Sequence, residues 1–267
     1  MSTKIASLFC VIVLTFLVFS CTSEVAVPVP DSNKKGSMKI ELEHKLGTQD
    51  FQLLQKLNLN DSVTITAEEF KYYVSNISLN KSDGTSYVVP QDSSYFLIDQ
   101  ANITSRSITL NSIPEGDYSS ITFILGVDSA RSVSSVDKRT GVLDVSNQAK
   151  SMYWTWNSGY IFFMFEGTYS SKLLFNNSFT YHIGGFGGYN SPSLNNIKTI
   201  SIPFGTSTIN IRESKKPHLH LIADIDKIFN NVSPISIIAN STVMFSPYSV
   251  YVANNYATMF RFDKIME

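Results

Sequence analysis

The chain has 267 residues, a formal net charge of −1 and 16% charged residues. Because no basic stripe is available to neutralise phosphates, nucleic acid is not expected as a partner. Hydrophobic residues make up 43% of the sequence, which is enough for a sizeable core and argues against a disordered main body.

The first twenty residues are typical of a processing segment. Their apolar run is too short to span a membrane but suits the hydrophobic region of a signal peptide. Val18–Cys21 resembles a lipobox, in which a small residue precedes the cysteine that receives the lipid. We predict a lipoprotein signal peptide over residues 1–20 and lipidation of Cys21, with a plain secretory signal cut near Ser20 or Ser23 as the alternative.

Cysteine use agrees with export. The chain has two cysteines, and Cys10 lies in the segment to be removed, so that only Cys21 remains and neither a disulfide nor a thiolate metal site is available. Residues 21–37, rich in proline, serine and lysine, read as a lipidated N-terminus and flexible linker, followed by one domain over residues 38–267. The lipid is expected to hold this domain at the bacterial outer membrane, on its periplasmic or surface face.

Strand signals dominate the domain. In residues 38–46, charged side chains occupy the odd positions, whereas apolar side chains and His44 occupy the even ones, as in a half-buried antiparallel strand. Ser82–Thr85 and Pro114–Asp117 are turn signals between further strands. Those strands are expected over residues 63–67, 72–79, 87–89, 95–98, 107–110, 118–125, 160–165, 179–183, 197–203, 206–212 and 218–225.

Helical signals are few. Ser246 and Pro247 are typical of the N-cap and first residue of a short helix that would end at Asn254 or Asn255. A helical turn is expected over residues 226–229. Many short strands with almost no helix predict an all-β protein, an antiparallel β-sandwich with one or two short helices near the C-terminus.

Several stretches form a pattern that covers nearly the whole chain after the linker. They include Glu41–Gly47 (ELEHKLG), Phe70–Leu79 (FKYYVSNISL), Ile113–Asp128 (IPEGDYSSITFILGVD), Met152–Gly167 (MYWTWNSGYIFFMFEG) and Tyr181–Gly184 (YHIG). In order and spacing these stretches resemble the MbnP-like family of copper-binding proteins, and Met152–Gly167 is the most specific of them.

The resemblance implies an exported β-rich protein that binds a copper ion, mostly through histidine. It also implies a frequent partner, a di-haem protein of the cytochrome c peroxidase class. In studied members this partner oxidises a tryptophan to kynurenine, which joins the copper site. Trp154 and Trp156 are therefore candidates for redox modification, with core packing as the alternative for both.

The chain contains four histidines, and imidazole is the expected copper ligand where thiolates are absent. His218 and His220 share a strand face, where they either close on one metal or stay exposed. His44 lies on an apolar face, and a core imidazole bonded to a carbonyl or an acid is the alternative to a ligand. His182 is either a ligand or a surface residue. We predict that His44 and His182 converge with at least one of the other two on a single copper ion.

A further ligand position is open to water, to a methionine such as Met152 or Met164, or to an oxidised tryptophan. No phosphate-binding loop or nucleophile motif indicates catalysis, so the protein is not expected to be an enzyme. We predict a membrane-anchored copper-binding lipoprotein that stores, delivers or senses the metal. The alternative, suggested by 18 Phe and 13 Tyr, is a metal-free binding or structural surface lipoprotein that recognises a polymer or a protein.

Overall fold

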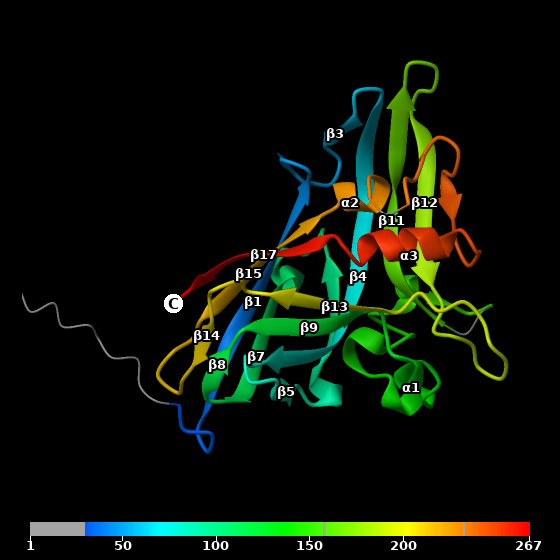
Figure 1. The fold of residues 1–267 in the computed structure, drawn as a ribbon. Helices are drawn as coiled ribbons and strands as arrows, with labels where there is room; N and C mark the ends of the chain where they lie inside the picture. The colour runs from blue at the N-terminus through cyan, green and yellow to red at the C-terminus, as the bar shows by residue number, and fades with distance from the viewer. Residues whose placement is uncertain (1–29, 157–158, 232) are drawn as a thin grey trace, which may run out of the picture.

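A computed structural model describes residues 30–156, 159–231 and 233–267 (Figure 1). The predicted signal peptide, Cys21 and most of the predicted linker lie outside these residues. The described strands form two large curled sheets and a two-stranded ribbon, accompanied by a few short helices. The predicted all-β, sandwich-like architecture is confirmed.

The strands of the described residues are β1 (Lys35–Leu46), β2 (Gln49–Asp50), β3 (Lys56–Asn60), β4 (Val63–Asn80), β5 (Ser86–Val88), β6 (Tyr95–Asp99), β7 (Ser107–Pro114), β8 (Gly116–Tyr118), β9 (Ser120–Leu125), β10 (Tyr153–Trp154), β11 (Gly159–Ser171), β12 (Asn177–Gly184), β13 (Lys198–Pro203), β14 (Ile209–Ile211), β15 (His218–Asp224), β16 (Thr242–Val243) and β17 (Phe260–Met266). The α-helices are α1 (Ser129–Ser132), α2 (Asp226–Phe229) and α3 (Ser249–Tyr256). Short 3-10 turns span Gln91–Ser93, Ile103–Arg106, Val136–Lys138, Gly141–Leu143 and Lys150–Met152.

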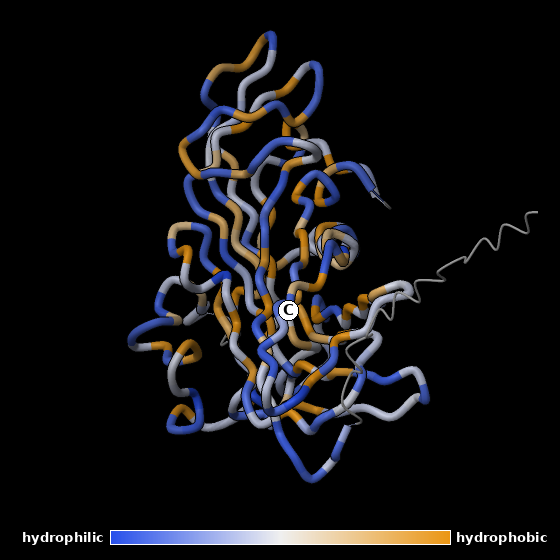
Figure 2. The backbone as a smooth tube through the Cα atoms, turned by 90° about the vertical axis from the view of Figure 1, so that its left-hand side faces the viewer, coloured by the Kyte–Doolittle hydropathy of each residue, from blue (hydrophilic) through white to orange (hydrophobic). Residues whose placement is uncertain are grey.

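The smaller sheet is built around β1, which pairs with β15 in parallel and with β2 and β7 in antiparallel orientation. The prediction that this strand is purely antiparallel is therefore wrong on the side of β1 that pairs with β15. The predicted alternation holds, because the even positions of β1 from Met38 to Leu46 are buried. Figure 2 shows this alternation of hydrophobic and hydrophilic residues along the strands. The strand begins at Lys35, so the end of the predicted linker belongs to the sheet.

The larger sheet follows the order β13-β9-β4-β11-β12-β16. Its longest strand, β4, has 18 residues and replaces two separate predicted strands. The first half of β4 pairs with β11 and its second half pairs with β9, so the sheet divides into two limbs that run in different directions (Figure 1). The segment from β9 to β11, which carries α1 and β10, joins these limbs.

Aromatic rings fill the core. Phe70 is fully buried, and its ring contacts those of His44, Tyr72, Phe163 and Phe165 edge-on, at centroid distances from 5.1 to 5.6 Å. Such edge-to-face pairs stabilise a core beyond the area that they bury. His44 is thus part of an aromatic cluster between the sheets.

Two of the three α-helices of the described residues lie near the C-terminus as predicted, whereas α1 was not predicted. Helix α2 has the predicted bounds, whereas α3 begins at Ser249 rather than at Ser246–Pro247. The carbonyl of Ser246 accepts bonds from both the backbone and the hydroxyl of Ser249, so Ser246 and Pro247 form a turn before the helix. No helix of the described residues is long and apolar enough to cross a membrane.

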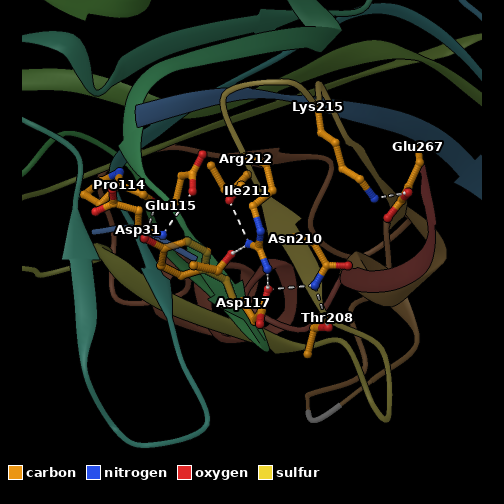
Figure 3. A network of polar contacts seen from close by, with 12 residues as sticks. Asp31, Pro114, Glu115, Asp117, Thr208, Asn210, Ile211, Arg212, Lys215 and Glu267 are labelled. Atoms are coloured by element: carbon orange, nitrogen blue, oxygen red, sulfur yellow. Dashed lines mark hydrogen bonds and ion pairs between the residues drawn. The ribbon is translucent and has the colours of Figure 1, made fainter. Parts of the chain in front are cut away.

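A polar network fixes the first described residues to the β8–β14 ribbon (Figure 3). Glu115 accepts one bond from the backbone N–H of Asp31 at 3.0 Å and another from that of Glu213 at 2.8 Å. The guanidinium of Arg212 donates to Asp117 at 2.8 Å and to the carbonyl of Gly116 at 3.1 Å. We call Glu115, with these two backbone bonds, the N-terminal clip.

Candidate functional site

The four histidines occupy three separate places. His44 points from β1 into the core, His218 and His220 lie on the outward face of β15, and His182 lies on β12 of the other sheet. Within the described ranges, no group of three His, Cys, Asp or Glu side chains is placed to hold a metal ion. The structure therefore does not bring three histidines together on one ion as predicted.

His44 is buried with both ring nitrogens hydrogen-bonded. Its Nδ1 lies 2.6 Å from Oε1 of Gln100 and its Nε2 lies 2.8 Å from the hydroxyl of Tyr72. The amide of Gln100 donates to the carbonyl of Phe51, which leaves its oxygen to accept from His44 Nδ1–H. Nε2 then accepts from Tyr72. Burial lowers the pKa of His44 to about 4, so the ring is neutral, as expected of a core residue.

His220 lies between two carboxylates. Its Nδ1 is 3.0 Å from Asp263 Oδ2, and its Nε2 is 3.5 Å from Glu43 Oε2. Asp263 stands at a register shift between β15 and β17, which turns this extra residue towards the histidine. Because both nitrogens of His220 face carboxylates, its ring is oriented by these two side chains rather than aimed at a metal shared with His218.

His182 differs in having one ring nitrogen anchored on a carboxylate. Its Nε2 bonds Glu166 on the neighbouring strand β11, and the side chain is 16% exposed. Met164 is its register partner across the ladder, so the two side chains stand on the same face of the sheet. A carboxylate on one nitrogen fixes the tautomer and leaves Nδ1 as the lone-pair donor, which is typical of metal-ligating histidines.

The two tryptophans connect this face to the surface. Trp154 is 5% exposed, and its ring lies directly over Gly184, where an added Cβ would be 2.7 Å from Cζ3. Gly184 shares its strand face with His182, two residues away. Trp156 is 65% exposed, and its ring centroid is 5.3 Å from that of Trp154. The pair therefore extends from the face of β12 that carries His182 to solvent.

Beside Trp156 the surface is hollowed. A cavity of about 660 Å³ lies between the segment that joins β9 to β11, the loop that joins β12 to β13, and Phe245. Its walls carry the rings of Tyr153, Trp156, Tyr189 and Phe245. We call this cavity the aromatic hollow.

Comparison with known proteins identifies the family. The family model of MbnP matches residues 35–245. The chain belongs to the MbnP family. The solved structure of MbnP from Methylosinus trichosporium resembles this chain with a TM-score of 0.51 and 13% sequence identity, covering 80% of this chain and 82% of that one. At this identity the likeness concerns the fold alone. No functionally curated protein matches the sequence.

The region that matches MbnP contains all four histidines and both tryptophans, whereas α3 and β17 follow it. Sequence reasoning found His182 and Trp154 but missed that Glu166 anchors the histidine. Alternation within β11 gave the only signal, because Met164 and Glu166 stand two residues apart on one face. The partners of His220 carried no such signal, since Asp263 is 43 residues away in the chain.

Proposed function

We propose that the protein is a membrane-anchored copper-binding lipoprotein that stores, delivers or senses the metal without a catalytic role. Membership of the MbnP family supports this proposal. The observation that carries it is the bond between His182 and Glu166, which leaves one imidazole nitrogen free to bind a metal. The lipid on Cys21 would hold the site at the outer membrane.

The side chains around His182 suit copper. Imidazole binds copper in either oxidation state, and the thioether of Met164 is a soft ligand that favours Cu(I). Glu166 would orient the imidazole and raise its basicity as a ligand. Trp154, over the neighbouring Gly184, is the tryptophan best placed to join the site after oxidation to kynurenine. A di-haem cytochrome c peroxidase-like partner would carry out that oxidation, with the exposed Trp156 as its point of contact.

Copper titration of the full chain, with a competing Cu(I) chelator, tests the proposed site. We expect tight binding of copper by the wild type and a loss of about tenfold or more in the affinity of His182→Gln, because a ligand is removed. Glu166→Gln should weaken binding by a factor of about 10–100, since the imidazole loses its orienting carboxylate. His218→Gln is the matched control and should bind copper like the wild type.

Two results would contradict this assignment. One is a wild-type protein that contains no copper by elemental analysis after purification from its native envelope and that binds none tightly in titration. The other is a His182→Gln protein with wild-type affinity. Circular dichroism of each variant shows whether the β-structure is kept, so that a lost ligand is distinguished from a lost fold.

A further inference from the structure

We propose that the aromatic hollow binds a neutral carbohydrate, with sugar rings stacked on the exposed faces of Trp156 and Tyr189. These side chains are 65% and 59% exposed, which is unusual for large aromatic residues of a folded surface. The volume of about 660 Å³ lies in the range of small-ligand sites and has room for a short oligosaccharide. This site is distinct from the proposed copper ligands and does not depend on the metal.

The exposed rings are held in place by neighbours. Trp156 contacts Trp154 and meets Phe245 at a centroid distance of 6.4 Å. The ring of Tyr189 contacts that of Phe186 at 6.4 Å, and its hydroxyl donates to the carbonyl of Val133. Rings that are fixed before binding lose little conformational freedom when a ligand stacks on them. The apolar C–H face of a pyranose matches such a surface.

The loop between β12 and β13 forms a rigid wall. Gly187 donates to the carbonyl of Leu194 at 3.0 Å and accepts from the backbone of Ser193 at 2.9 Å. At Gly188, with a φ of +102°, a Cβ would lie 1.9 Å from the carbonyl oxygen of Ser191, so a larger residue cannot replace the glycine without moving the loop. The loop is therefore built to one shape.

The charges of the lining residues select the ligand class. Arg139 is the charged residue among them, and its guanidinium is committed to the carbonyls of Ser132 and Ser134 and to the hydroxyl of Tyr153. Among the described residues that line the hollow, no carboxylate is present to bind a cation. No basic side chain other than the committed Arg139 is present among them to bind an anion. Asn190, Ser191 and Ser193 supply neutral amide and hydroxyl groups. Neutral hydrogen-bonding groups beside aromatic faces fit the hydroxyl edges of an uncharged sugar.

Isothermal titration calorimetry of the full chain without copper tests this inference, with maltotetraose, cellotetraose and N-acetylchitotetraose as neutral probes. We expect at least one of them to bind saturably and to change the intrinsic fluorescence, because Trp156 lines the hollow and its ring contacts that of Trp154. Trp156→Ala and Tyr189→Ala should each weaken binding by about tenfold, since each removes a stacking surface. Phe175→Ala is the control, because this aromatic residue is 77% exposed but lies outside the lining of the hollow.

The inference fails if none of the neutral probes binds, or if Trp156→Ala binds a probe as tightly as the wild type does. It also fails if an oligogalacturonate or choline binds more tightly than every neutral probe, because the ligand would then be charged. Copper affinity is measured on the same variants. If Tyr189→Ala keeps copper binding and loses sugar binding, the two sites are separate.

Discussion

Three of the four imidazole rings differ in the groups that their nitrogens contact, and these contacts decide what each ring can do. His44 has an amide and a phenol as partners, His220 has two carboxylates, and His182 has one carboxylate and a neighbouring thioether. The sequence predicted that His44 needs a partner on its apolar face. It could not predict Tyr72 and Gln100, because these residues lie 28 and 56 positions away and meet His44 only when the sheets pack.

The buried neutral state of His44 predicts a loss of stability in mild acid. Its pKa is about 4 in the folded protein, below the ordinary 6.5, mainly because burial disfavours the charged ring. Between these values the unfolded chain binds a proton that the folded protein does not bind. The free energy of unfolding should therefore fall by about 3 kcal/mol from pH 6.5 to pH 4 on account of this residue. Urea unfolding of the full chain at several pH values measures the slope.

Two variants isolate the contribution of His44. His44→Gln cannot take up a proton in this pH range, so its stability should depend less steeply on pH, although it is lower overall because a buried ring is lost. His218→Gln changes a half-buried histidine on the outward face of β15 and should keep the wild-type slope. Equal slopes in His44→Gln and the wild type would show that His44 is not the titrating group.

At the scale of elements, alternation was predictable and strand continuity was not. Two strands were predicted over residues 63–67 and 72–79, where β4 runs without a break. The strand continues through a bulge at this point, which shifts its register against β11. On the outward side of the strand, Lys71 pairs with Glu69 at 2.6 Å. The partner strand accommodates the bulge with Gly167, where a Cβ would lie 2.2 Å from the carbonyl oxygen of Thr66. These pairings join strand segments that are distant in the sequence, so local residue patterns do not predict them.

The N-terminal clip depends on both oxygens of the Glu115 carboxylate, so removal of one of them should open it. In Glu115→Gln an amide NH₂ replaces one of the two accepting oxygens, so one backbone N–H loses its acceptor and faces a donor. We expect faster hydrogen exchange at the backbone amides of Asp31 and Glu213, which donate to this carboxylate. Mass spectrometry or NMR of the full chain measures the exchange.

The matched control is Glu213→Gln, because the side chain of Glu213 is 70% exposed and pairs with Lys34 at 3.7 Å. It should leave the exchange unchanged. The two backbone bonds also hold the pKa of Glu115 below its usual range. The clip should therefore persist where an ordinary glutamate is protonated and open only at lower pH. Unchanged exchange in Glu115→Gln would rule out the clip.

At the scale of the molecule, the aromatic hollow is assembled from three loop segments that lie far apart in the sequence. The glycines from Gly184 to Gly188 were visible in the sequence, but their role as a wall depends on Leu194 and Phe245, which no periodicity connects to them. The β8–β14 ribbon, which holds the first described residues, and α1, near the hollow, lie on opposite sides of the molecule (Figure 1). The described part of the chain therefore begins on the side of the domain opposite the hollow.

The proposed lipid anchor on Cys21 leads to a prediction about the whole chain. Each buried methylene of an acyl chain contributes about 0.8 kcal/mol, so stable anchoring needs more than one chain and disappears when the acceptor cysteine is removed. Cys21→Ala should incorporate no radiolabelled palmitate and should leave the membrane fraction without detergent. Cys10→Ala is the matched control, because this cysteine lies inside the predicted signal peptide and should not affect labelling. Continued labelling of Cys21→Ala would contradict the lipobox assignment. Copper binding by Cys21→Ala should match the wild type, because the proposed ligands lie within residues 35–245 and the proposed anchor would only place them at the membrane.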